Sequence, residues 1–217
     1  MREMFRMISY ILLVVGIIIT LFSYLLLFIK WIFNKNKVID EYSGFDASKE
    51  VTSNYDEINI VSSSDVIFSE YDIKRNVIRL NSKNYDSNSY FDVAVSVLLA
   101  GYSLVNVENK NYFKFVVILK RIGYIGFVSL IGSILSCFIS NIGDAKIGIV
   151  IFGVLLVYQY MKYQMNVDAG DKIKEVLDKE KYDNIENIIS SIINFNKLSF
   201  IIMLIFIIRL VVIILGM

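Results

Sequence analysis

The stretch Ser89–Val105, SYFDVAVSVLLAGYSLV, decides the fold, because it is the one long apolar segment inside the longest polar region of the chain. Ser89 stands three residues before Asp92, and a hydroxyl and a carboxylate at this spacing can each cap a free backbone N–H at the start of a helix. The sequence therefore predicts a central helix that begins near Ser89 and runs through Val105.

Long apolar runs dominate the rest of the chain. Of its 217 residues, 56% are hydrophobic and none is proline, and a soluble domain of this size does not carry continuous apolar runs of about twenty residues. The run at residues 8–29, formed into a helix, would span about 30 Å, the thickness of a bilayer core. Further runs cover residues 122–142, 147–161 and 198–217. We predict an α-helical integral membrane protein with about four transmembrane helices.

The polar segments predict a small α+β portion. The first contains a predicted helix at residues 45–55 with Asp46 as its N-cap, and β-branched or aromatic runs separated by turn residues, which we interpret as a short antiparallel sheet. These runs cover residues 58–61, 66–71 and 77–80. The second polar segment is predicted to be helical from about Asp168. The predicted organisation is an N-terminal transmembrane anchor (1–33), an α+β region (34–121), a transmembrane helical hairpin (122–161), a helical segment (162–197) and a C-terminal transmembrane helix (198–217).

The distribution of cations predicts the orientation in the membrane. Thirteen Lys and Arg residues flank the membrane runs on the side of the two polar segments, and only Arg2, Arg6 and Lys146 flank them on the other. Because loops on the cytoplasmic side are enriched in Lys and Arg, we expect a multi-pass protein of the cell membrane. Both polar segments would be cytoplasmic and both termini outside.

The composition excludes several kinds of chemistry. The chain has no histidine and a single cysteine, Cys137, within an apolar run. Histidine supplies most zinc ligands and most general bases near neutral pH, so Ser-His-Asp, Cys-His and His-based zinc mechanisms are excluded. The net charge of +1 gives no reason to expect a nucleic-acid partner.

The stretch Tyr71–Leu80, YDIKRNVIRL, resembles the strand–turn–strand that precedes the catalytic helix in the bacterial membrane-bound neutral zinc metallopeptidases. The order of elements resembles that family along nearly the whole chain: a Val-rich helix, two membrane runs, an Asp-Ala-Gly helix start and a final apolar helix. The resemblance implies the fold of that family, with a peptidase-like α+β region at 34–121.

In that family the central helix carries His-Glu-x-x-His, whose two imidazoles share one helical face and ligate zinc while the Glu activates water. The resemblance places the two His positions on Leu98 and Tyr102, the Glu on Leu99, and a further acidic ligand on Asn166. None of these side chains replaces the lost donors, because leucine cannot bind a metal and neutral tyrosine is a poor ligand. The resemblance thus implies the fold but argues against the activity.

We therefore predict a degenerate family member without catalytic residues, metal site or cofactor. Such a pseudoenzyme would act as a scaffold or as a partner- or substrate-binding protein. Its expected partners are the lipid bilayer and either a membrane protein or a second copy of the chain.

Two alternatives stay open. Asp168 and Asp171 with Tyr102 could form a non-standard carboxylate site of a membrane metallopeptidase. The stripe Asp168, Asp171, Glu175 and Asp178 has helical spacing, but interleaved lysines favour a solvated helix face. Arg209, inside the last apolar run, could serve a small transporter, although an arginine so near the chain end is more typical of snorkelling to the membrane surface.

Overall fold

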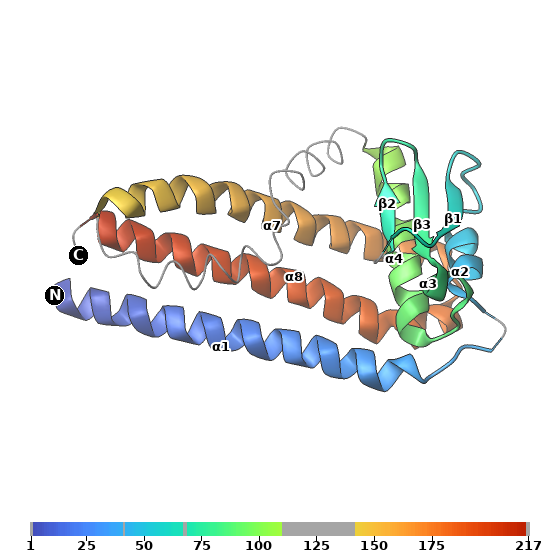
Figure 1. The fold of residues 1–217 in the computed structure, drawn as a ribbon, viewed down its shortest axis with the longest axis horizontal. Helices are drawn as coiled ribbons and strands as arrows, with labels where there is room; N and C mark the ends of the chain where they lie inside the picture. Colours follow the sequence, from blue (N-terminus) through green and yellow to red (C-terminus); the bar gives the residue numbers. More distant parts are fainter. Residues whose placement is uncertain (1, 41, 67–68, 110–141, 216–217) are drawn as a thin grey trace. The chain divides into compact units, whose positions relative to one another are not determined.

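The structure of the chain is a computed structural model that describes residues 2–40, 42–66, 69–109 and 142–215 (Figure 1). The chain divides into two compact units. The first unit comprises residues 1–26, 118–163 and 195–217, and the second comprises residues 27–117 and 164–194. The described part of the chain is mostly helical, as predicted.

The first unit is helical. Its segments come from α1 (Arg2–Lys35), α7 (Ile142–Val176) and α8 (Lys179–Ile214), which lie side by side in Figure 1. The ring centroids of Tyr24 and Phe195 are 4.7 Å apart, which packs α1 against α8, and those of Phe152 and Phe206 are 6.4 Å apart, which packs α7 against α8. Other faces of these helices expose large apolar side chains, including Phe22, Val150 and Ile208. Such faces suit lipid better than water.

Four helices among the described residues are long and apolar enough to cross a membrane: α1, α7, α8 and α4 (Tyr90–Glu108). In α4, however, 67% of the most apolar window is buried inside the protein, against 12% in α1. Its apolar side chains therefore belong to a protein core, as predicted for the central helix. The other three overlap the predicted runs 8–29, 147–161 and 198–217 and are compatible with a membrane protein. The predicted run 122–142, with Cys137, lies outside the described residues.

The second polar segment forms no helix of its own, because the helices of the membrane runs before and after it extend into it. We predicted a separate helix beginning near Asp168, but α7 runs unbroken from Ile142 to Val176, and α8 from Lys179 to Ile214. The reason is that this part of the chain holds no proline, so the change from apolar to polar side chains does not interrupt the backbone hydrogen bonds of the helix.

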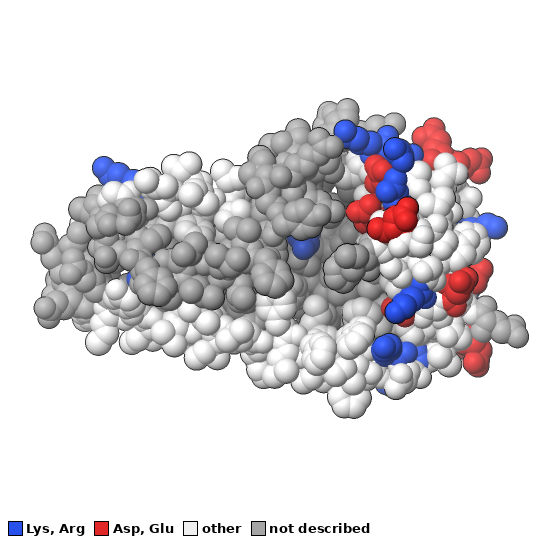
Figure 2. Space-filling model, viewed as in Figure 1, with Lys and Arg blue, Asp and Glu red and all other residues white. Residues whose placement is uncertain are grey.

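The core of the second unit gathers buried side chains from α4, from one face of a small sheet and from the parts of α7 and α8 that belong to this unit. Its shorter helices are α2 (Gly44–Val51) and α3 (Ser82–Asp86), and its strands are β1 (Asn59–Ser63), β2 (Glu70–Asp72) and β3 (Val77–Asn81) (Figure 1). On β3 the side chains alternate, with Ile78 and Leu80 fully buried. Charged side chains gather over this unit in Figure 2.

The sheet is mixed, so the predicted antiparallel sheet is only partly correct. β2 and β3 pair antiparallel, as a hairpin should, but β1 pairs parallel with the other edge of β3, giving the order β1-β3-β2. The chain after β1 must therefore cross the end of β3 to reach β2. Asn81 holds that crossing: its backbone N–H donates to Ser69 Oγ (2.9 Å) and its side-chain amide to the carbonyl of Val66 (2.6 Å). Such long-range bonds leave no periodic signal in the sequence.

The helix starts follow capping chemistry. Ser89 is the N-cap of α4, as predicted, and its hydroxyl accepts from the backbone N–H of Asp92 at 3.2 Å. The Asp92 carboxylate accepts from hydroxyls of Ser87 and Ser89 rather than from a backbone N–H. The prediction of Asp46 as N-cap of α2 is wrong. Ser43 is the N-cap, and Asp46 is the carboxylate of a capping box that reaches back to the Ser43 N–H.

Candidate functional site at the crossing of α4 and α7

The positions that the resemblance assigned to zinc chemistry lie on two helices of the second unit. Leu98, Leu99 and Tyr102 are on α4, and Asn166 is on α7. Leu98 and Tyr102, four residues apart, share one face of their helix. Leu98 is 5% exposed and Leu99 is 8% exposed, so both leucines are core side chains.

Tyr102 and Asn166 are in direct contact. The Tyr102 hydroxyl donates a hydrogen bond to the side-chain carbonyl Oδ1 of Asn166. Asn166 is fully buried and Tyr102 is half-buried. Two positions that are 64 residues apart in the sequence thus meet, and the group that joins them is a neutral hydrogen bond between helices.

The two helices approach closely beside this bond. A Cβ atom added to Gly101 would lie 2.8 Å from the backbone carbonyl oxygen of Ala169 and 2.9 Å from Cδ1 of Ile173. No side chain fits between the two backbones at that point. Gly101 therefore sets the spacing of α4 and α7, and the spacing brings the Tyr102 hydroxyl within reach of Asn166.

An ion pair joins the same two helices near the end of α4. Lys172 Nζ lies 2.9 Å from Glu108 Oε1 and 3.4 Å from Glu175 Oε2. The hydrogen bond from Lys172 to Glu108 raises the pKa of the lysine. Both side chains of the Lys172–Glu108 pair are partly exposed, so the pair contributes little to stability.

A polar network ties the stretch Tyr71–Leu80 to α4. The Tyr71 hydroxyl accepts from Asn106 Nδ2 on α4 at 2.8 Å and donates to Asn76 Oδ1. Asn76 has φ 55°, a left-handed conformation that asparagine tolerates better than most residues, and its amide donates to the carbonyl of Glu57 at 2.9 Å. Burial raises the pKa of Tyr71 to about 12, with the carboxylate of Asp72 adding to the rise and the Asn106 hydrogen bond opposing it.

The side chains at the crossing do not fit a zinc ion. Zinc in proteins is bound by Cys thiolates, His nitrogens and carboxylates, whereas the four assigned positions offer two hydrocarbons, a phenol and an amide. Among the residues that the structure describes, no three His, Cys, Asp or Glu side chains come together in a way that could hold a metal ion.

The predicted carboxylate stripe lies on the surface. Asp168, Asp171 and Glu175 of α7 are exposed, and so is Asp178, which follows the end of that helix. Partial burial of its carboxylate raises the pKa of Asp168, and the charge of Asp171 adds to this rise. An exposed stripe of this kind offers no enclosed site in which carboxylates could activate water.

The comparisons with known proteins agree with the resemblance in the sequence. A family model described as "Putative neutral zinc metallopeptidase" matches residues 7–215, nearly the whole chain. The chain belongs to this family. Comparison with curated proteins and with solved structures gave no match. The chain is therefore a neutral zinc metallopeptidase family member by descent, and it is one that carries no histidine.

Sequence reasoning missed the residues that assemble the second unit around the crossing. Glu50 on α2 accepts from the Tyr42 hydroxyl at 2.9 Å and from Lys181 Nζ at 2.6 Å, and the ammonium group also lies 4.5 Å from the centroid of the Tyr42 ring. Burial raises the pKa of Tyr42 well above its usual value, helped by its hydrogen bond to the Glu50 carboxylate. Lys181 is 131 residues from Glu50, so no local pattern could predict this cluster. Gly101 carried a local signal, since a glycine inside a helix usually has a packing reason.

Proposed function

We propose that the chain is a non-catalytic member of the neutral zinc metallopeptidase family, a pseudoenzyme that acts as a membrane scaffold or as a partner- or substrate-binding protein. One observation carries the proposal. The family resemblance expects two histidines, at positions 98 and 102, a glutamate at 99 and an acidic ligand at 166. This chain has Leu98, Tyr102, Leu99 and Asn166 there, and the side chains of Tyr102 and Asn166 are hydrogen-bonded to each other.

The contact between Tyr102 and Asn166 supports this reading of the positions. The phenol and the amide satisfy one another and use the space between α4 and α7 for a structural bond. Buried leucines complete the replacement, and burying one leucine side chain stabilises a fold by about 1.5–3 kcal/mol. A site that had lost one ligand by chance would keep the remaining polar donors, and here all four positions have changed in character.

A cleavage assay tests the lack of catalysis. Purified full-length protein in detergent or nanodiscs is incubated with an unfolded casein substrate and with a membrane-protein substrate, with and without 1,10-phenanthroline. We expect no cleavage above that of a mock purification. Cleavage that co-purifies with the protein and is lost on adding the chelator would contradict the proposal. Asp168→Ala then tests whether the exposed stripe of α7 takes part in such cleavage.

We also propose the orientation derived from the cation count, with both polar segments in the cytoplasm. Lys83 on α3 and Lys146 on α7 are both exposed, and the chain's single cysteine can be removed by Cys137→Ser. In that background we expect Lys146→Cys to react with a membrane-impermeant maleimide in intact cells. Lys83→Cys should react only after the membrane is permeabilised, and the reverse pattern would contradict the orientation.

A further inference from the structure

The outer edge of β1 is an open strand edge. Among the described residues, the sheet ends at β1, because β3 is its single partner strand. The Asn59 N–H donates to the carbonyl of Asn76 at 3.2 Å, just before β3. Since successive residues of a strand point their backbone groups to opposite sides, Asn59, Val61 and Ser63 face β3, whereas Ile60 and Ser62 turn their N–H and C=O groups outward.

We propose that this edge binds an extended peptide segment of a partner protein by strand addition, with basic residues in that segment flanking an uncharged centre. The inference rests on the proposed binding role of the chain and names the kind of partner. Strand addition to an open edge takes affinity from main-chain hydrogen bonds and specificity from neighbouring side chains.

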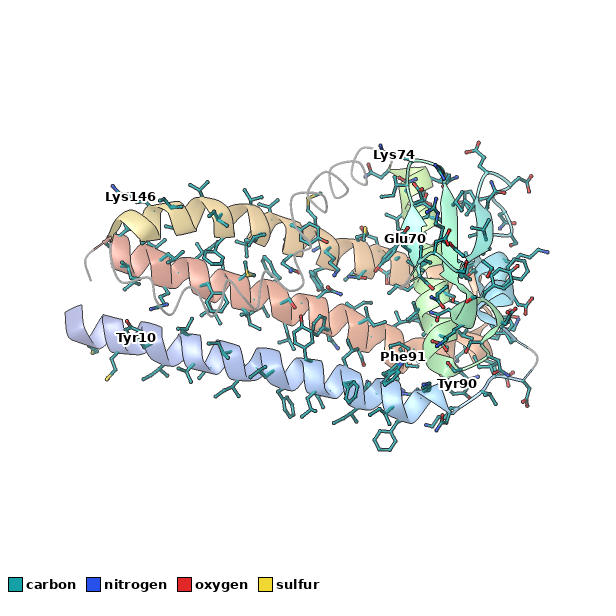
Figure 3. The ribbon with its side chains drawn as sticks, viewed as in Figure 1. Tyr10, Glu70, Lys74, Tyr90, Phe91 and Lys146 are labelled. Atoms are coloured by element: carbon teal, nitrogen blue, oxygen red, sulfur yellow. The ribbon has the colours of Figure 1, made fainter. Side chains whose placement is uncertain are left out.

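The two edges of the sheet differ in how well they are protected against pairing with another strand. β2, the other edge, carries Glu70 and Asp72, and both pair with Arg79 of β3, at 3.8 Å and 3.5 Å (Figure 3 labels Glu70). Charges on an edge strand are a common means of preventing unwanted pairing. β1 has the sequence Asn-Ile-Val-Ser-Ser, without a charge or a proline. β1 has five residues, and such a short edge suits a weak and reversible partner.

Val61 offers a side-chain contact for the added strand. It is paired in register with Arg79, so it lies on the sheet face opposite the buried Ile78 and Leu80, and it is 40% exposed. An apolar side chain beside Val61 on the added strand would cover it. Cross-strand pairs of this kind contribute to both affinity and register.

Charges at the two ends of β1 indicate whether a second copy of the chain or a different protein binds its open edge. Asp56 and Glu57 precede the strand and Asp65 follows it, and all three are exposed. If two copies of β1 paired antiparallel with full overlap, Val61 would face its own copy and Glu57 would face Asp65 of the other strand. Like charges directly opposite one another destabilise a sheet. Lysine or arginine at the ends of the added segment would instead be attracted to both flanks.

A defined peptide tests the proposal with the full-length protein in nanodiscs. The probe is Lys-Arg-Thr-Val-Thr-Val-Thr-Lys-Arg-amide with fluorescein on its N-terminal α-amine, and the matched probe has glutamate in place of every lysine and arginine and the same label. We expect saturable binding of the basic probe by fluorescence anisotropy, and binding of the acidic probe about tenfold weaker or less. Hydrogen exchange of the Ile60 and Ser62 amides should slow when the basic probe is added.

Substitutions within β1 separate strand addition from surface attraction. Ser62→Pro removes an outward N–H that β3 does not use, which an edge strand tolerates, and should weaken binding about tenfold, the loss expected for about one good hydrogen bond. Ser62→Ala keeps that N–H and should bind as the parent does. Glu57→Lys/Asp65→Lys should reverse the preference and favour the acidic probe.

Several outcomes would overturn the inference. These are no saturable binding of the basic probe, equal binding by folded Ser62→Pro, or unchanged exchange of the two amides in the complex. Disulfide-linked dimers of Val61→Cys in the Cys137→Ser background would show that a second copy occupies the edge. If Ser62→Pro does not fold, the probe preference of Glu57→Lys/Asp65→Lys and the hydrogen exchange of the Ile60 and Ser62 amides still test the inference. The zinc content and the cleavage assay test the non-catalytic role and do not depend on β1. A result that contradicts that role can therefore be told apart from a result that contradicts peptide binding at β1.

Discussion

At the scale of single residues, Tyr102 and Asn166 stand at positions where the family resemblance expects zinc ligands, and a hydrogen bond joins their side chains. Two ligand positions must lie close together to share a metal ion, and the same closeness lets a phenol and an amide form one hydrogen bond. A buried polar group needs such a partner, because leaving it unsatisfied costs about 1–3 kcal/mol. The hydrogen bond therefore gives Tyr102 and Asn166 a structural role at the crossing of α4 and α7.

The Tyr102 hydroxyl is expected to stabilise the second unit. Tyr102→Phe leaves the fully buried Asn166 without this donor, and we expect it to lower the free energy of unfolding by about 1–3 kcal/mol. Asn166→Leu removes the acceptor instead. A double-mutant cycle over the two substitutions, followed by thermal unfolding in one detergent, should give a coupling energy of about 0.5–3 kcal/mol. Additive single effects would contradict a direct bond.

Alkaline pH should destabilise the second unit through Tyr71. Its pKa is about 12 in the folded protein, above the value of about 10 for an exposed phenol. The unfolded chain therefore loses this proton first. The stabilisation from Tyr71 is fully present below pH 10 and is lost as the pH rises toward 12. Unfolding temperatures of the parent and Tyr71→Phe, measured from pH 8 to 12, should show a shallower alkaline decline in the variant, and parallel curves would contradict the assignment.

At the scale of elements, the crossing of α4 and α7 depends on the absence of a side chain at Gly101. Gly101→Ala would bring Cβ against a backbone carbonyl, which cannot move aside as a flexible side chain can. We expect a loss of about 1–3 kcal/mol from overpacking. Gly153→Ala on α7 is the matched control, because a Cβ there meets no atom within 4 Å. Its unfolding temperature should stay the same or rise, and equal losses in both variants would contradict a specific contact.

The elements that were predictable from the sequence are those with local signals. The N-cap at Ser89, the apolar length of α1 and the hairpin of β2 and β3 all rest on residues within a few positions of one another. The parallel pairing of β1, the cluster around Glu50 and the bond of Tyr102 to Asn166 join residues that are distant in the chain. Asp46 shows that even a local signal can be assigned to the wrong position, because Ser43 could serve as N-cap with Asp46 as its capping-box partner.

At the scale of the whole molecule, the assignment of the four positions and the proposed lack of catalysis can be tested together by introducing the expected zinc donors. Leu98→His/Leu99→Glu/Tyr102→His/Asn166→Glu returns the His-Glu-x-x-His spacing to α4 and a carboxylate to α7. We expect this variant to bind about one zinc per chain, because the crossing already holds positions 102 and 166 in contact. The triple variant without Asn166→Glu is the control and should bind more weakly. If neither binds zinc, the assignment of these four positions is wrong.

The zinc content of the unaltered protein tests the central claim most directly. The full-length chain is purified from membranes without chelators, and its metals are measured by elemental mass spectrometry against protein concentration from amino-acid analysis. The replacement of every expected donor predicts zinc far below one atom per chain, unchanged after dialysis against a chelator. About one tightly bound zinc per chain would contradict it and would point to a working metallopeptidase.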